Sequence, residues 1–104
     1  MMIVTTDSIS DKKIKKTLGV VRGNTIRARH VGKDILAGLK NVFGGEIEEY
    51  TKLMAEAREQ AIDRMTSSAE EMGANAVINV RFTTSFIMGA ASEILAYGTA
   101  VIVE

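Results

Sequence analysis

The feature that most constrains the fold is a change of hydrophobic period within residues 46–82. From residue 46 to 72, apolar side chains recur every three or four positions, which is the spacing of one helical stripe. The stripe comprises Ile47, Tyr50, Met54, Ala57, Ala61, Met65 and Met72, with Leu53 and Ile62 on its flanks. Gly73 then stands where a left-handed helix cap is expected. From residue 75 the period is two, with Ala76, Ile78, Val80 and Phe82 in alternation. The sequence therefore predicts a long helix packed on a sheet.

Four further segments complete the predicted elements. Met2–Thr6 is a short β-branched run with strand character. Residues 17–29 also resemble a strand, with an imperfect alternation that two arrangements explain. One is a bulge near Gly23-Asn24, which we favour, and the other is a tight turn there. Residues 32–43 have helical spacing and stop at two glycines, whereas residues 93–103 are apolar on both parities. The latter pattern is typical of a central strand covered on both faces, so we place that strand in the middle of the sheet.

The apolar side chains of the last strand also predict self-association. The predicted helices suffice for one face of the sheet, and the other face would carry Leu95, Tyr97, Val101 and Val103. So large an apolar patch is unusual on a monomer. The Met2–Thr6 strand, including Ile3, would pair with the exposed sheet edge of a neighbouring copy. Because such a contact is heterologous, it closes into a ring, with Ile3, Leu95, Tyr97 and Val101 at the interface.

Composition sets limits on the chemistry. The chain has 104 residues, enough for a single domain spanning 1–104, and it contains no Cys, which excludes disulfides and thiolate metal sites. No apolar run is long enough to span a membrane and no signal peptide is evident, so we expect a cytoplasmic protein.

Residues 1–45 hold nine Lys or Arg against three Asp or Glu, and residues 46–104 hold four against ten. We expect these halves to attract each other within or between subunits, and we do not expect a nucleic-acid partner.

Two candidate ligand sites follow from the residues. His30 is the single histidine, and with no Cys it cannot complete a zinc site within one chain, although a ring would bring several copies together. Arg22, Asn24, Lys40 and Asn41 would form an anion pocket beside the glycine pair; alternatively, Arg22 pairs with an acidic residue of the next subunit. The methionines of the helical stripe are expected to fill the core. We find no nucleophile–base pair, so the chain is not expected to be an enzyme.

Four segments resemble the YbjQ-type family of small bacterial and archaeal proteins. They are LGVVRGNT at 18–25, GKDILAGLKNVFGGEIEEY at 32–50, GANAVINVRF at 73–82 and EILAYGTAV at 93–101. The resemblance implies a dodecin-subunit-like fold with strand order 1-3-2, assembly into cyclic pentamers, and the family's usual description, "putative heavy-metal-binding". The chain departs from the family pattern at Asp11, where a glycine is common, and at Phe86, where an acidic residue is common.

Together these observations predict an α+β fold of two layers. We expect an antiparallel three-stranded sheet in order 1-3-2, covered by one long and one short helix, plus a short N-terminal strand. The expected function is a cytoplasmic homopentameric ring that binds a heavy metal or another small ligand, with a divalent metal ion as the candidate cofactor. The alternative is a structural or interaction module that carries no metal.

Overall fold

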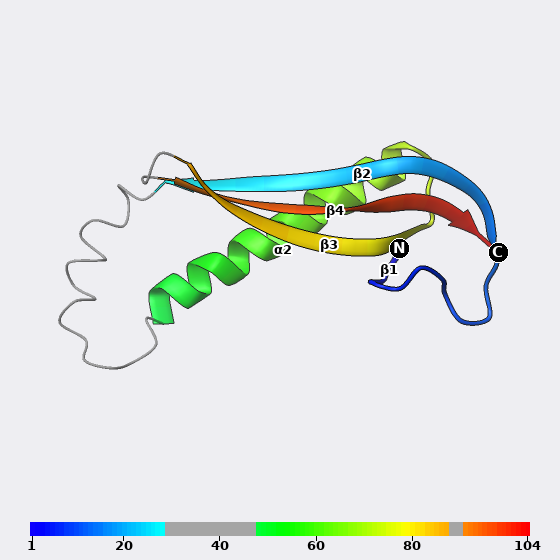
Figure 1. The fold of residues 1–104 in the computed structure, drawn as a ribbon, viewed down its shortest axis with the longest axis horizontal. Helices are drawn as coiled ribbons and strands as arrows, with labels where there is room; N and C mark the ends of the chain where they lie inside the picture. The colour runs from blue at the N-terminus through cyan, green and yellow to red at the C-terminus, as the bar shows by residue number, and fades with distance from the viewer. Residues whose placement is uncertain (29–47, 88–90) are drawn as a thin grey trace.

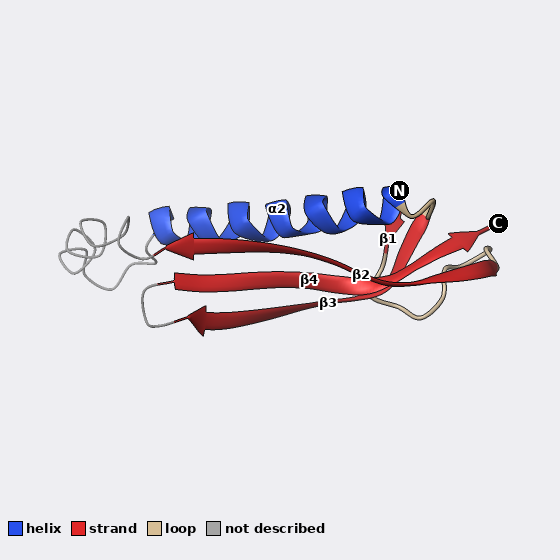
Figure 2. Ribbon diagram, turned by 90° about the horizontal axis from the view of Figure 1, so that it is seen from above, coloured by secondary structure: helices blue, strands red, loops and turns tan. Residues whose placement is uncertain are grey.

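The computed structural model describes residues 1–28, 48–87 and 91–104, with one helix and four strands among them (Figure 1). The elements in chain order are β1 (Met2–Ile3), β2 (Ile14–Ala28), α2 (Glu48–Glu71), β3 (Ala76–Ile87) and β4 (Ala91–Val103). Helix α2 lies along one face of the sheet, and the opposite face carries no helix among the described elements (Figure 2). The predicted α+β class is therefore confirmed. The short helix predicted over residues 32–43 lies outside the described residues.

The sheet differs from the predicted one in strand number and in strand direction. Its order is β1-β3-β4-β2, so the last strand is central, as predicted from its two apolar faces. Strands β2 and β3 both run antiparallel to β4, but β1 runs parallel to β3. The prediction of a three-stranded, wholly antiparallel sheet is wrong, because the sheet has four strands and is mixed.

The N-terminal segment occupies the edge of β3 in its own chain. Strand β1 pairs Ile3 with Val77, and the Val4 N–H donates to the Val77 carbonyl over 2.9 Å. The Val80 N–H then donates to the Val4 carbonyl over 3.0 Å, and the Asn79 N–H to the Thr6 carbonyl over 2.9 Å. The prediction that this segment pairs with a neighbouring copy is therefore wrong in this structure, because the segment satisfies its backbone groups along β3.

Helix α2 buries a stripe of mostly small side chains. Ala57, Ala61, Met65 and Ala69 are fully buried, whereas Met72, which we predicted on the stripe, is 40% exposed beyond the helix end. The helix ends as predicted, because Gly73 takes a φ of 87°. The Gly73 N–H donates to the Glu70 carbonyl over 3.0 Å, and the Ala74 N–H donates to the Ala69 carbonyl over 3.0 Å. These two bonds satisfy carbonyls that the helix end leaves without partners.

Strand β2 approaches the helix so closely that one position admits only glycine. A Cβ atom on Gly23 would lie 2.3 Å from the Met65 backbone nitrogen and 2.4 Å from the Ala61 carbonyl oxygen. Two residues on, the Thr25 hydroxyl donates to the Ala57 carbonyl over 3.1 Å. The predicted bulge or turn at Gly23-Asn24 is wrong, because the pairing with β4 is continuous there. The register shifts instead at Ile14/Lys16 and at Thr17/Gly19, where Gly19 has a φ of 128°.

Strand β3 changes face at a bulge. The pairing with β4 shifts between Ile78 and Arg81, and Asn79 has a φ of 53° there. As a result, Val77 and Val80 both pack in the helix-side core, whereas Ile78 belongs to the core on the opposite face. The predicted simple alternation from Ala76 to Phe82 is therefore wrong.

A second, smaller core covers one end of the sheet on the face away from the helix. It consists of Ile9, Ala76, Ile78, Val101 and Val103, with Val4 packed against it. At this end of the sheet, β4 is apolar on both faces because the chain's own N-terminal segment covers the face away from the helix. Because Val101 is fully buried here, the predicted apolar patch does not extend to it.

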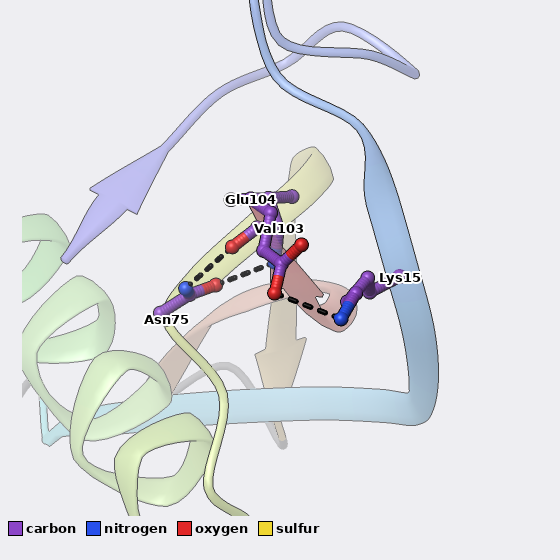
Figure 3. Close-up of polar contacts among 4 residues, drawn as sticks. All are labelled: Lys15, Asn75, Val103 and Glu104. Carbon is purple, nitrogen blue, oxygen red and sulfur yellow. Dashed lines mark hydrogen bonds and ion pairs between the residues drawn. The ribbon is translucent and has the colours of Figure 1, made fainter.

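Polar contacts hold the C-terminal end of β4 in place (Figure 3). The Asn75 side chain accepts from the Val103 N–H and donates to the Val103 carbonyl, both over 2.8 Å. Lys15 Nζ lies 2.8 Å from the Glu104 carboxylate. The Asn75 amide therefore replaces the backbone of an adjacent strand at the point where β3 has not yet begun.

Candidate functional site

The candidate site is the part of the sheet face pointing away from α2 that no described element covers (Figure 2). In β2, Val21, Gly23 and Thr25 face the helix, so the residues between them point to the other side. Strand register then places residues of β4 and β3 on the same side. We call this surface the helix-free face; it comprises Val20, Arg22, Asn24, Ile26, Arg81, Thr83, Ser85, Glu93, Leu95, Tyr97 and Thr99.

Two arginines flank a tyrosine across the middle of the helix-free face. Arg22 of β2 and Arg81 of β3 are both paired with Tyr97 of the central strand, so the three residues share one row, although the Arg81 guanidinium reaches the N-terminal segment on the far side of β3. Tyr97 is 38% exposed, and both arginines are exposed. This row presents two positive charges on either side of an aromatic ring, which suits a partner that carries carboxylates or other anionic groups.

Two backbone carbonyls hold the Arg81 side chain in place. One of its guanidinium nitrogens donates to the Thr5 carbonyl over 2.8 Å and to the Val80 carbonyl over 2.9 Å. Both acceptors are neutral. The single ion pair among the described residues joins Lys15 and Glu104, at the other end of the sheet. The positive charge of the row is therefore not neutralised within the described part of the chain.

A hydrogen bond links the next two rows of the face, which are Asn24–Leu95–Thr83 and Ile26–Glu93–Ser85. The Asn24 side-chain amide donates to a Glu93 carboxylate oxygen over 3.1 Å. The Asn24 backbone carbonyl accepts from Arg64 of the helix over 2.6 Å, which ties β2 to α2 at this position. Glu93 places one negative charge on the same face, two rows away from the two arginines.

Apolar side chains border these polar rows. Val20 is 72% exposed and Ile26 is 57% exposed, both in β2, and Leu95 of β4 is half-buried. On the helix side of the sheet, Phe82 is 45% exposed because α2 lies mainly over β2 and β4. Val20, Ile26, Leu95 and Tyr97 are thus the apolar part of the helix-free face.

The structure brings together some of the predicted site residues and separates others. Arg22 and Asn24 lie on the helix-free face in adjacent rows, whereas His30, Lys40 and Asn41 lie outside the described residues. Of the predicted interface residues, Leu95 and Tyr97 lie on the helix-free face. The other two do not, since Val101 is buried beneath the N-terminal segment and Ile3 packs on the helix-side core.

Sequence reasoning missed two residues of this face, Arg81 and Glu93. The alternation predicted for β3 ignored the bulge at Asn79, so Arg81 could not be aligned with Tyr97. Within residues 1–28, 48–87 and 91–104 no group of three or more Asp, Glu or His side chains is arranged to hold a metal ion. Met65 is fully buried and packs in the helix-side core, as predicted for the methionine stripe.

Comparison with known proteins identifies the family. Over residues 1–104 the chain matches the YbjQ family, described as "putative heavy-metal-binding". This chain belongs to that family. A UPF0145 protein of Methanosarcina acetivorans is 62% identical over 101 residues, which cover 97% of this chain and 95% of that protein. A UPF0145 protein of Dehalococcoides mccartyi is 61% identical over the full length of both chains. The resemblance found in the sequence is thus confirmed.

A solved structure shares the fold of this YbjQ-family chain. It is a protein of unknown function from Pediococcus pentosaceus, assigned to the DUF74 family. The two superpose with a TM-score of 0.65 at 17% identity, over 100% of this chain and 98% of the other. None of these relatives carries an enzyme name. Among the described residues no helix is long and apolar enough to cross a membrane.

Proposed function

We propose that this YbjQ-family protein is a cytoplasmic homo-oligomeric ring, with five subunits, that binds a metal ion or another small ligand between its subunits. The observation that carries the assembly is the helix-free face, which combines exposed Val20, Ile26 and Tyr97 with two arginines. Burying about 300 Å² of the apolar area of this face contributes about 7 kcal/mol before the costs of association and of desolvating the arginines. That is comparable with the whole stability of a small domain. The number five follows from the family resemblance.

The ligand part of the proposal rests on the family description and on where charged residues lie. A metal site built from the described residues of one chain would need three or more ligating side chains together, and they contain no such group. We therefore place the ligand between subunits, where copies of His30 or of carboxylates from several chains would meet. Arg22 and Arg81 give the same surface an affinity for anionic ligands.

Light scattering coupled to size-exclusion chromatography tests the assembly. The unmodified chain at micromolar concentration should elute with five times the 11.3 kDa mass of one chain. A folded monomer under these conditions would refute the ring. A folded oligomer of another size would be consistent with a ring but would refute the count of five subunits.

Elemental analysis and calorimetry test the ligand. Purified protein should retain a metal at a fixed stoichiometry per subunit or per ring, and zinc binding should weaken in the His30→Ala variant. High zinc affinity that is unchanged in His30→Ala would exclude the histidine. If the ring forms but no metal is retained or bound, the function reverts to the alternative, a structural or interaction module.

A further inference from the structure

The described sheet has two long edges, and neither is fully paired. Strand β2 forms one edge, and β3 lies at the other, beneath the short β1. The N-terminal segment pairs with β3 only as far as Val80, whose N–H donates to the Val4 carbonyl over 3.0 Å. Over residues 82–87, no described element pairs with the outer side of β3. We call residues 82–87 the β3 edge and residues 20–28 the β2 edge.

We propose that the β2 edge of one subunit pairs, strand to strand, with the β3 edge of the next copy of the same chain. This inference rests on the proposed ring, and it names the two surfaces that form each contact within it. The paired strands run parallel, and they continue the sheet from one subunit into the next. Because the contact joins two different surfaces, it is heterologous and repeats from copy to copy.

The backbone groups of both edges point outward at the same interval. In β3 the Val80 N–H faces the N-terminal segment, so the backbone groups of Phe82 and Thr84 face the same outer side. The residues between them bond to β4, and the register carries this alternation across to β2, where Arg22 and Ile26 face outward. Each edge therefore offers one N–H and one carbonyl at every second residue, as a parallel ladder requires.

The β3 edge has none of the features that usually prevent strand pairing. Its sequence, FTTSFI, contains no charged residue, no Pro and no Gly, and it is rich in residues that favour strands. Exposed edges in natural proteins are commonly protected by charges, by proline or by a bulge. The bulge of β3 lies at Asn79, where the N-terminal segment already covers the edge. An edge of this composition is suited to pairing with another strand.

The two edges match in extent and in direction. Strand β2 shifts register between Thr17 and Gly19, where the φ of Gly19 is 128°, and its first residues curve away (Figure 1). The remaining stretch, 20–28, can therefore lie along residues 82–87 clear of the next copy's N-terminal segment. Both strands run antiparallel to β4, so they are parallel to each other. Copies related by rotation about one axis keep that shared direction, and the contact between them is parallel.

Pairing between these edges is compatible with a closed ring. The two edges of a sheet are the surfaces that meet when a sheet curls and closes into a barrel. Five copies of the three long strands, β2, β3 and β4, would give about 15 strands, close to the number that encloses a water-filled channel. A twofold contact between two β3 edges would instead leave both β2 edges unpaired. The head-to-tail contact leaves neither kind of edge unpaired once the ring closes.

The off-centre position of α2 fits the same contact. The helix packs on β2 and β4 and much less on β3, so Phe82 is 45% exposed on the helix side of the sheet. On the outer side of β2, Arg64 reaches the Asn24 carbonyl over 2.6 Å. The same flank of the helix carries Leu53, eleven residues earlier, which is 37% exposed. When β3 of the next copy lies beside β2, this flank extends over its Phe82 and covers it.

Amide hydrogen exchange of the assembled protein, followed by NMR, tests the contact at single residues. In an isolated chain the outward N–H groups of Phe82 and Thr84 exchange as free amides. In the ring they should exchange at least about a hundredfold more slowly, and so should those of Arg22 and Ile26. A ring in which the Phe82 and Thr84 amides exchange as free amides would overturn the proposal.

Proline substitutions provide an independent measurement. Thr84→Pro and Ile26→Pro each remove one outward N–H, and an edge strand tolerates proline at such a position. Each variant should raise the protein concentration at which the oligomer half-dissociates by at least about tenfold. Thr84→Ala and Ile26→Val are the matched controls. Because they shorten the side chain and keep the N–H, they should shift that concentration by less than about threefold.

Mixing the two proline variants shows which edges meet. Each variant keeps one intact edge, and the two intact edges are of different kinds. An equimolar mixture should therefore form a pair with twice the 11.3 kDa mass of one chain, which cannot extend into a ring. A Thr84→Pro chain that dimerises alone would show pairing between two β2 edges, and an Ile26→Pro chain that does so would show pairing between two β3 edges. Either result, or a mixture that stays monomeric, would contradict the proposed contact.

The outcomes separate this contact from the ring itself. If the unmodified chain is a monomer at micromolar concentration, the proposed ring fails and the contact fails with it. If the unmodified chain is a ring but Thr84→Pro assembles as well as Thr84→Ala, the edge contact is overturned while the ring stands. Far-UV circular dichroism checks that each variant is folded. Where a proline variant does not fold, the exchange measurement on the unmodified chain decides.

Discussion

The closest contact between the two layers predicts that Gly23→Ala is strongly destabilising. An ideal Cβ at this position would lie 2.3 Å from Met65 N, 2.4 Å from Ala61 O and 2.9 Å from the Arg64 carbonyl carbon. All three atoms belong to the helix backbone, so no side-chain rotation relieves the overlap. The helix must move away from β2 by about 1 Å, because ordinary contacts of this kind begin near 3.4 Å.

The expected loss of unfolding free energy follows from the hydrogen bonds that α2 would weaken by moving away from β2. The Thr25–Ala57 and Arg64–Asn24 hydrogen bonds, at 3.1 Å and 2.6 Å, both bridge β2 and α2 beside Gly23. Weakening each costs about 1 kcal/mol. Overpacking typically costs about 1–3 kcal/mol, and the upper end applies where the obstacle is backbone. We therefore expect a loss of about 3–4 kcal/mol, or a fall in Tm of about 12–30 °C.

Urea denaturation and thermal melts monitored by circular dichroism measure this loss. Gly19→Ala is the matched control, because nothing lies within 4 Å of its Cβ position and its φ of 128° is the source of strain there. It should cost about 1 kcal/mol. Ala61→Gly should not rescue Gly23→Ala, because the obstructing atom is the Ala61 carbonyl oxygen and not its methyl group. A Gly23→Ala variant as stable as Gly19→Ala would refute the close approach of the helix.

Three further substitutions test the same structure. Asn75→Ala should cost about 2 kcal/mol in urea denaturation and accelerate amide exchange at the end of β4, because two 2.8 Å bonds to Val103 are lost. Val101→Asp should abolish folding, as seen by circular dichroism, since this residue is fully buried, whereas Thr83→Asp on the exposed face should fold. Lys15→Ala should change the unfolding free energy by less than about 0.5 kcal/mol, because the Lys15 and Glu104 side chains are 61% and 63% exposed; a larger loss would contradict this reasoning.

The parts of the fold that depend on long periodic patterns could be predicted from the sequence. The helix, its glycine cap and the central place of β4 follow from hydrophobic spacing alone. The missed features depend on single backbone conformations. Asn79 adopts a φ of 53° and reverses the faces of β3, but nothing distinguishes Asn79 from Asn75 in the sequence. Hydrophobic alternation cannot reveal this bulge, because the three residues before Asn79, at 76–78, are all apolar and fit either face of the sheet.

The candidate site was predicted less completely, because its residues meet across strands. Arg22 and Tyr97 were each singled out, but their pairing requires the register of β2 with β4. Gly23 was interpreted as a bulge, although its role is to admit the helix backbone. Ile9 lies between β1 and β2 outside any periodic pattern, yet it packs with Val101 in the second core and so removes that residue from the exposed surface.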